Sequence, residues 1–186
     1  MDIKLSEQAH MLKDSNLFVN PSEGMSLLEK QKIFLVLAGR KQVTEVYSGH
    51  WEQLSPNERR TVADDPKEVA ALLDALGLSY RLQPQEHTIA ATIALDQTVL
   101  DHYFDIASRS NNDLELGKLF GYPQTAAEGF IQNKHLDTAT QDKVIAAAGL
   151  PDYFATFFLS TDHYQEEIAT LKEWYSLLEQ YGLVAS

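Results

Sequence analysis

The sequence contains no cysteine, and this absence excludes several kinds of chemistry. Disulfide bonds, thiolate metal sites and cysteine nucleophiles all require this residue, and none occurs among the 186 residues. Any transition-metal site would have to be built from the six histidines and the carboxylates. No other cofactor signature is present, so no cofactor is expected.

Long apolar runs are also absent. The longest, from Ile33 to Ala38, has six residues, whereas a membrane-spanning helix needs about 20. The first residues lack the basic start and apolar run of a signal peptide. We therefore expect a cytoplasmic protein that has no membrane partner.

Basic residues are scarce. Lysine and arginine total 15 against 27 acidic residues, which gives a net charge of −12. The excess acid is concentrated late in the chain, with a net charge of 0 over residues 1–50 and −6 over residues 135–186. An acidic surface repels nucleic acid and anionic lipid; it favours basic partners or serves solubility.

The common catalytic motifs are missing. We find no Walker A loop, Gly-x-Gly-x-x-Gly fingerprint, His-Glu-x-x-His or Gly-x-Ser-x-Gly motif, and no EF-hand loop. The absence of these motifs does not exclude a serine or threonine nucleophile, because its catalytic partner residues need not be near it in sequence. The sequence favours a non-enzymatic protein and leaves an enzyme as an alternative.

Capping patterns predict where several helices begin. A capping residue is followed three positions later by glutamate in three places: Ser26 with Glu29, Ser55 with Glu58, and Asp65 with Glu68. In the last two pairs a proline also occupies the first helical position. Apolar spacing and terminating glycines indicate helices over 5–13, 26–38, 66–76, 96–110, 138–148 and 161–181.

Alternating apolar residues predict a small antiparallel sheet. Residues 78–82 and 89–95 alternate on either side of a loop at 83–87, which indicates a hairpin with Ile89, Ile93 and Leu95 on one face. Residues 43–47 form a short β-rich stretch, expected as an edge strand. The predicted fold is a mainly helical α+β domain covering 1–186, with seven or eight helices and two or three strands.

The last predicted helix, 161–181, carries an apolar stripe. Its members step by four and three residues along one face: Tyr164, Ile168, Leu171, Tyr175, Leu178 and Tyr181. Such a stripe is typical of core packing, and the alternative is the seam of a homodimer.

The most organised stretch of the sequence is a predicted corner between two helices, at 113–133. Leu116, Leu119 and Phe120 recur at helical spacing, Gly121 suits the left-handed end of a helix, and Pro123 suits the first turn of the next. Two short helices are therefore expected to meet at a sharp turn.

This stretch resembles the helix-turn-helix of repressor-type DNA-binding proteins over residues 113–132. The resemblance rests on these residues: Leu116, Gly117, Phe120, Gly121, Tyr122, Ala127 and Phe130. It implies that the second helix enters the major groove and presents Gln124, Thr125, Glu128 and Gln132. The local charge of −1 between Asp113 and Lys134 disfavours nucleic acid as the partner, and Pro123 replaces the usual capping serine or threonine.

The Leu-Gly-x-x-x-Gly-Tyr-Pro string also resembles a segment of prokaryotic proteins of unknown function, in which two cysteines follow. Thr125 and Ala126 stand at those places here, so cysteine chemistry of that kind is excluded. If the corner binds a partner, Tyr122 joins Gln124 and Thr125 as a candidate contact.

Two histidines have carboxylates at helical spacing. His102 with Asp105, and His163 with Glu166, could each contribute ligands to a metal site. Neither pair is sufficient alone, so no metal is predicted. Asp96 follows a predicted strand and opens a helix, a place where small ligands collect, although a plain helix cap is the favoured explanation.

Taken together, these features favour an acidic, cytoplasmic, non-enzymatic protein that binds another macromolecule, with a protein as the expected partner. The first alternative is a transcriptional regulator that binds DNA through residues 123–132. The second is a small enzyme with a histidine and carboxylate site.

Overall fold

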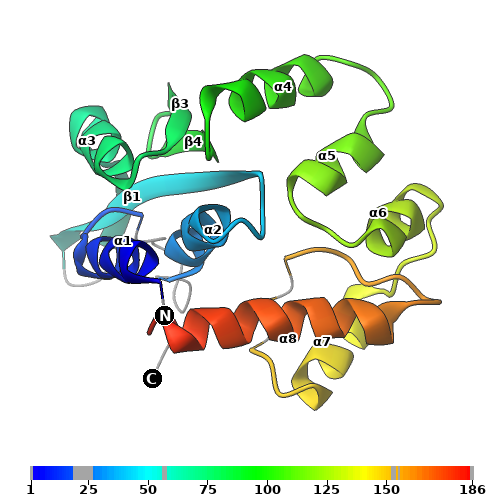
Figure 1. The fold of residues 1–186 in the computed structure, drawn as a ribbon. Helices are drawn as coiled ribbons and strands as arrows, with labels where there is room; N and C mark the ends of the chain where they lie inside the picture. The colour runs from blue at the N-terminus through cyan, green and yellow to red at the C-terminus, as the bar shows by residue number, and fades with distance from the viewer. Residues whose placement is uncertain (1, 19–26, 56–57, 152–153, 155, 185–186) are drawn as a thin grey trace.

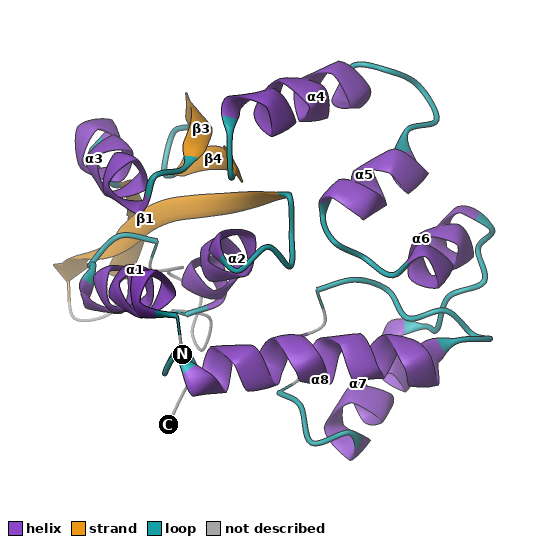
Figure 2. Cartoon of the chain, in the orientation of Figure 1, coloured by secondary structure: helices purple, strands orange, loops and turns teal. Residues whose placement is uncertain are grey.

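The computed structural model describes residues 2–18, 27–55, 58–151, 154 and 156–184, with the side chains of 51–61 left out. This part of the chain forms eight helices and one four-stranded antiparallel sheet (Figures 1 and 2). The helices are α1 (Ile3–Asp14), α2 (Leu28–Leu37), α3 (Pro66–Leu76), α4 (Gln97–Ala107), α5 (Asp113–Leu119), α6 (Gln124–Ile131), α7 (Thr138–Ala147) and α8 (Tyr164–Gln180). The strands are β1 (Val43–Ser55), β2 (Glu58–Ala63), β3 (Ser79–Pro84) and β4 (Ile89–Ala94).

The sheet is larger than predicted. Its order is β2-β1-β4-β3, so the stretch at 43–47 is not a short edge strand but the start of a 13-residue central strand. The predicted hairpin of β3 and β4 is confirmed, with Leu82 opposite Ala91. The extra strand exists because β1 continues past the β-rich stretch through polar residues and pairs with β2.

The helix start predicted at Ser55 is wrong. Ser55 ends β1 and pairs with Glu58, the first residue of β2; Pro56 lies outside the described residues. Serine followed by proline is also common in turns, and pairing of the two strands gives the backbone of 58–63 its hydrogen-bond partners. Long-range pairing therefore outweighed a local capping signal.

Helices α3 and α7 begin directly after the capping residues in the sequence. Asp65 accepts a hydrogen bond from the Lys67 amide at the start of α3, and Asp137 accepts one from the Thr140 amide at the start of α7. Helix α2 begins near the predicted place, but Ser26 lies outside the described residues. Glu29 is buried rather than exposed as a capping partner, and its Oε2 accepts the Tyr47 amide at 3.1 Å.

Helix α8 begins a few residues later than Thr161 or Asp162, the predicted starts. Ser160 explains the difference, because its hydroxyl accepts the His163 amide at 3.0 Å and donates to Oε1 of Glu167 at 2.7 Å. Glu167 is fully buried and its Oε2 accepts the Ser160 amide at 2.6 Å. These bonds hold residues 161–163 in a turn before the helix.

Alternation along β4 divides the core into two clusters. Ile89, Ala91 and Ile93 face the main cluster, which α1, α2, α3 and α8 also supply. Ala94 belongs to a smaller cluster under α4 and α5. Leu95 was predicted to share the face of Ile89 and Ile93, but it follows the strand and is exposed.

Helix α8 runs below α1 and α2, which lie between it and the sheet, so the two ends of the chain lie on the same side (Figure 1). Leu171 and Leu178 are fully buried in the main cluster, and the rest of the predicted stripe packs against it. The stripe therefore serves the core of this chain. Within the described residues, no helix is long and apolar enough to cross a bilayer.

Candidate functional site

The predicted corner is present as α5 and α6. Gly121 has φ of 74°, the left-handed conformation that glycine adopts without a steric penalty, and the Tyr122 amide donates to the Gly117 carbonyl at 2.9 Å. Pro123 is the N-cap of α6 instead of a residue in its first turn. A Cβ at Gly117 would lie 2.9 Å from that of Ala127, so glycine lets the two helices pack closely.

The corner is held against the start of β1. The Gln42 amide donates to the Leu119 carbonyl at 2.9 Å, and the Lys41 ammonium donates to the Phe120 carbonyl at 3.1 Å. A Cβ at Gly121 would overlap the carbonyl oxygen of Arg40. The turn therefore has two requirements for glycine, its φ angle and the close approach of another backbone segment.

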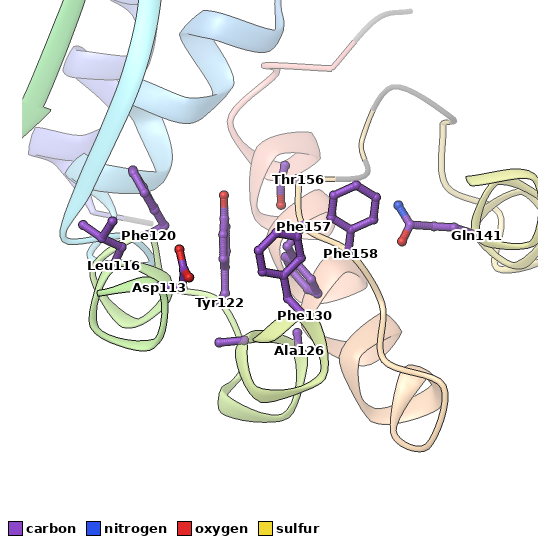
Figure 3. Close-up of a pocket in the computed structure, with 12 residues that line it drawn as sticks. Asp113, Leu116, Phe120, Tyr122, Ala126, Phe130, Gln141, Thr156, Phe157 and Phe158 are labelled. Atoms are coloured by element: carbon purple, nitrogen blue, oxygen red, sulfur yellow. The ribbon is translucent and has the colours of Figure 1, made fainter. Parts of the chain in front are cut away.

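An aromatic cavity of about 370 Å³ opens between the corner and the segment that follows α7 (Figure 3). Helices α5 and α6 and the turn between them form most of its walls. Tyr122, in that turn, stands at the centre between Phe120 and Phe157. Its lining residues are Asp113, Leu116, Gly117, Phe120, Tyr122, Ala126, Ala127, Phe130, Gln141, Thr156, Phe157 and Phe158.

Three aromatic rings gather at the rim of this aromatic cavity: Phe130 and Phe158 from its lining, and His135 beside them. The ring of Phe130 lies 5.8 Å from those of Phe158 and His135, and the rings of His135 and Phe158 are 5.0 Å apart. Phe130 is 46% exposed and Phe158 is 42% exposed. Ile131 beside them is also exposed, which makes this rim a cluster of large apolar groups in contact with solvent.

A second, more polar cavity of about 390 Å³ lies on the other side of Tyr122. We call it the lysine cavity, because Lys41 and Lys32 both line it. It shares Phe120, Tyr122 and Thr156 with the aromatic cavity. Its other lining residues are Leu28, Thr44, Glu45 and Tyr47.

Lys41 is the most unusual group in the lysine cavity. It is only 4% exposed, and its Nζ lies 5.0 Å from the Tyr122 ring centre and 4.9 Å from that of Trp174. Burial, with a contribution from the nearby charge of Lys32, lowers its pKa to about 7. Among the described residues, no carboxylate lies within ion-pair distance of it.

Two further groups of this region are perturbed. The Tyr122 pKa is raised by burial and, to a lesser extent, by the charge of Glu45. Glu45 in turn accepts a 2.5 Å hydrogen bond from the Tyr103 hydroxyl, and burial and that bond raise the pKa of Tyr103. Both tyrosines are therefore neutral at physiological pH.

The corner residues predicted as contacts fall into two groups. Tyr122 lines both cavities, whereas Gln124 and Glu128 lie along α6 and bind each other, Nε2 to Oε1, at 2.6 Å. Thr125 is half-buried and Gln132 is exposed at the end of α6. The four α6 residues therefore lie outside the lining of both cavities.

The residues considered for small ligands or metals are dispersed. Asp96 caps α4 and accepts the Val99 amide at 3.0 Å. His102 is exposed, and Asp105 binds Arg109. His163 lies 3.9 Å from Glu166 at the surface. Across the described part of the chain, no three histidine or carboxylate side chains converge as a metal site would require.

A serine, a histidine and an aspartate do meet on the sheet. The Ser48 hydroxyl donates to Asp64 at 2.5 Å, and His50 Nδ1 lies 2.9 Å from the same carboxylate. In a catalytic triad the histidine lies between the other two, whereas here the aspartate does. Ser48 also accepts the Phe18 amide and is fully buried, so this cluster joins the segment that follows α1 to the sheet.

Sequence reasoning missed Lys41, Thr156 and the rim phenylalanines. Lys41 follows a helix end and has the ordinary appearance of a surface lysine, and its burial depends on Tyr122 and Trp174, which are far away in sequence. The one available signal was the aromatic composition of 153–159, part of which lies outside the described residues.

Comparison of the chain with protein-family models, with curated proteins and with solved structures found no match.

Proposed function

We propose that this protein is a non-enzymatic, cytoplasmic binding protein that recognises another protein through the aromatic cavity and its rim. The observation that carries the proposal is the pair of exposed rings, Phe130 and Phe158, at the mouth of a preformed cavity of about 370 Å³. Exposed apolar clusters of this kind are typical of interaction surfaces.

The cavity suits one large apolar side chain from the partner. Leu116, Phe120 and Phe157 supply apolar walls, and a buried aromatic or aliphatic side chain is the usual source of binding energy at an interface. Phe130 and Phe158 would lose their exposed surface at the same time. Burial of apolar surface contributes roughly 25 cal/mol per Å² before the entropy cost of association.

The expected partner is basic around that side chain. Asp113 lines the cavity, and residues 96–134 and 135–186, which surround it, carry net charges of −3 and −6. Charge complementarity of this kind accelerates association and selects partners. A positively charged segment with one protruding apolar residue therefore matches both the shape and the charge of the site.

The proposal can be tested with random 12-residue peptides displayed on phage and selected on the immobilised protein. We expect enrichment of peptides that combine one large apolar residue with neighbouring lysine or arginine. A synthetic copy of an enriched peptide should bind at least about ten-fold more weakly to the Phe130→Ala, Phe158→Ala double variant. Its affinity should also fall as salt is raised.

Leu95→Ala is the matched control, because Leu95 is exposed to the same degree, 42%, but lies outside the lining of either cavity. Its peptide affinity should equal that of the wild type. Failure to enrich any peptide, or equal binding to the double variant, would reject this function.

A further inference from the structure

We propose that the lysine cavity is a separate site for the carboxylate of a small apolar acid. The polar groups that line it, the size of the space and its continuity with apolar walls together indicate this class of ligand. The two cavities share Phe120, Tyr122 and Thr156. The inference is nevertheless independent of protein binding at the aromatic rim, because the acid is recognised through Lys41 and Thr156 and not through the phenylalanine rings of the rim.

The first argument is the charge in the cavity. Lys41 is nearly completely buried, yet within the described residues its hydrogen-bond partner is a neutral carbonyl and not a carboxylate. A buried ammonium without an ion-pair partner is costly. A carboxylate placed beside Lys41 would supply the missing counter-charge, whereas Lys32, which lines the same cavity, is already paired with Glu29 at 3.0 Å.

The second argument is Thr156. Its hydroxyl oxygen is buried and has no hydrogen-bond partner among the described residues, although buried polar groups are usually satisfied. Thr156 lines the same cavity as Lys41. A carboxylate can accept from a hydroxyl and an ammonium simultaneously, so one ligand group would satisfy both.

Glu45 restricts the number of carboxylates that the ligand can carry. It lines the lysine cavity as well, and the Tyr103 hydroxyl binds its Oε1. A second carboxylate on the ligand would meet this negative charge. The ligand is therefore expected to carry one carboxylate, at the Lys41 end of the cavity.

The walls that the two cavities share indicate what the apolar part of the ligand contacts. Phe120, Tyr122 and Thr156 border both cavities, so a chain or ring attached to the carboxylate would pack on aromatic surface. The cavity of about 390 Å³ is in the size range of small-molecule sites. An arylalkanoic acid fits both the chemistry and the space.

Proton linkage gives the site a recognisable pH dependence. The pKa of Lys41 is lowered to about 7 in the free protein, and a bound carboxylate favours the protonated amine. Binding should therefore be strongest below pH 7 and should weaken as the pH rises toward 9, when the free protein has lost that proton. Carboxylate binding by ordinary surface lysines would not change over this range.

The experiment compares 3-phenylpropionate with its neutral isostere 3-phenylpropionamide. The ring centre of Trp174 lies 4.9 Å from Lys41 Nζ. The chain has two tryptophans, so in a Trp51→Phe background the fluorescence comes from Trp174 alone and reports on the site. At pH 6.5 we expect the acid to bind at least about ten-fold more tightly than the amide, and the ratio to fall by pH 9.

Two variants and one control complete the test. Lys41→Met preserves much of the side-chain volume and should bring the acid-to-amide ratio to about one, and Thr156→Val should lower it while leaving the fold unchanged. Lys118→Met, which removes an exposed lysine of α5, should keep the wild-type ratio. No response to the acid at 10 mM, equal binding of acid and amide, or a ratio unaffected by Lys41→Met and Thr156→Val would overturn the proposal.

Discussion

The backbone carbonyl of Arg40 lies where a side chain on Gly121 would have to be. This contact places the turn between α5 and α6 directly against the residues that lead into β1. The turn of a sequence pattern that resembles a DNA-binding motif thus packs against another segment of the same chain. The adjoining hydrogen bonds of Gln42 and Lys41 to the same turn reinforce the contact.

Replacement of Gly121 by alanine should be far more costly than the same change at Gly149. Both glycines have positive φ, 74° and 77°, so both lose about 1 kcal/mol from the left-handed conformation. Gly149 has open space around its Cα, whereas Gly121 faces the Arg40 carbonyl. Urea denaturation should show an additional loss of about 2 kcal/mol for Gly121→Ala; equal losses would mean that the contact with Arg40 relaxes freely.

Glu167→Gln should destabilise the protein by about 2 kcal/mol, because a buried charged acceptor loses strength in its bonds to the Ser160 amide and hydroxyl. Glu166 is adjacent and exposed, so Glu166→Gln should change stability by less than about 0.5 kcal/mol. Thermal and urea unfolding of the two variants measure the difference. Similar values for both would show that the buried bonds contribute little.

Lys41 should make the stability of the protein rise with pH between 7 and 10.5. Its pKa is lowered from 10.5 to about 7 on folding, so in this window the unfolded chain holds a proton that the folded protein has released. Relative to Lys41→Met, the wild type should gain about 2 kcal/mol of unfolding free energy between pH 7 and pH 9. A pH-independent difference in urea denaturation would show that Lys41 keeps its proton.

Duplex DNA should not bind appreciably even in low salt. From Asp113 to Lys134 the net charge is −1, and non-specific attraction to DNA depends on several lysine or arginine contacts to phosphates. Fluorescence anisotropy with a labelled random duplex at 20 mM salt measures this. A steeply salt-dependent signal that disappears in the Gln124→Ala, Thr125→Ala double variant would instead support the regulator.

Local signals in the sequence predicted those parts of the fold that depend on neighbouring residues. Asp65 and Gly77 bound α3 as expected, because a cap and a left-handed terminator act within a few residues. The sheet was underestimated, since β1 owes its length to pairing with β2 and β4. Ser55 shows where local signals fail: its sequence has the pattern of a helix cap, but strand pairing with β2 determines its structure.

The candidate site was predictable only in part. Tyr122 was identified from the corner pattern and does line both cavities. Lys41 and Thr156 were not, because their roles arise from burial against elements distant in the sequence. The sequence around a lysine does not show whether its side chain is buried between two aromatic rings or exposed to water. No periodicity or motif distinguishes the two cases.

The hydrogen bond from Gln31 to the Leu183 carbonyl joins residues 152 positions apart. Together with the packing of Phe34 on Tyr181, it means that part of α2 is covered only by the residues that follow α8. During synthesis on a ribosome the part of α2 that these residues cover therefore stays exposed until residues 181–183 have emerged. Such a non-local closure slows folding and lengthens the exposure of apolar surface to aggregation.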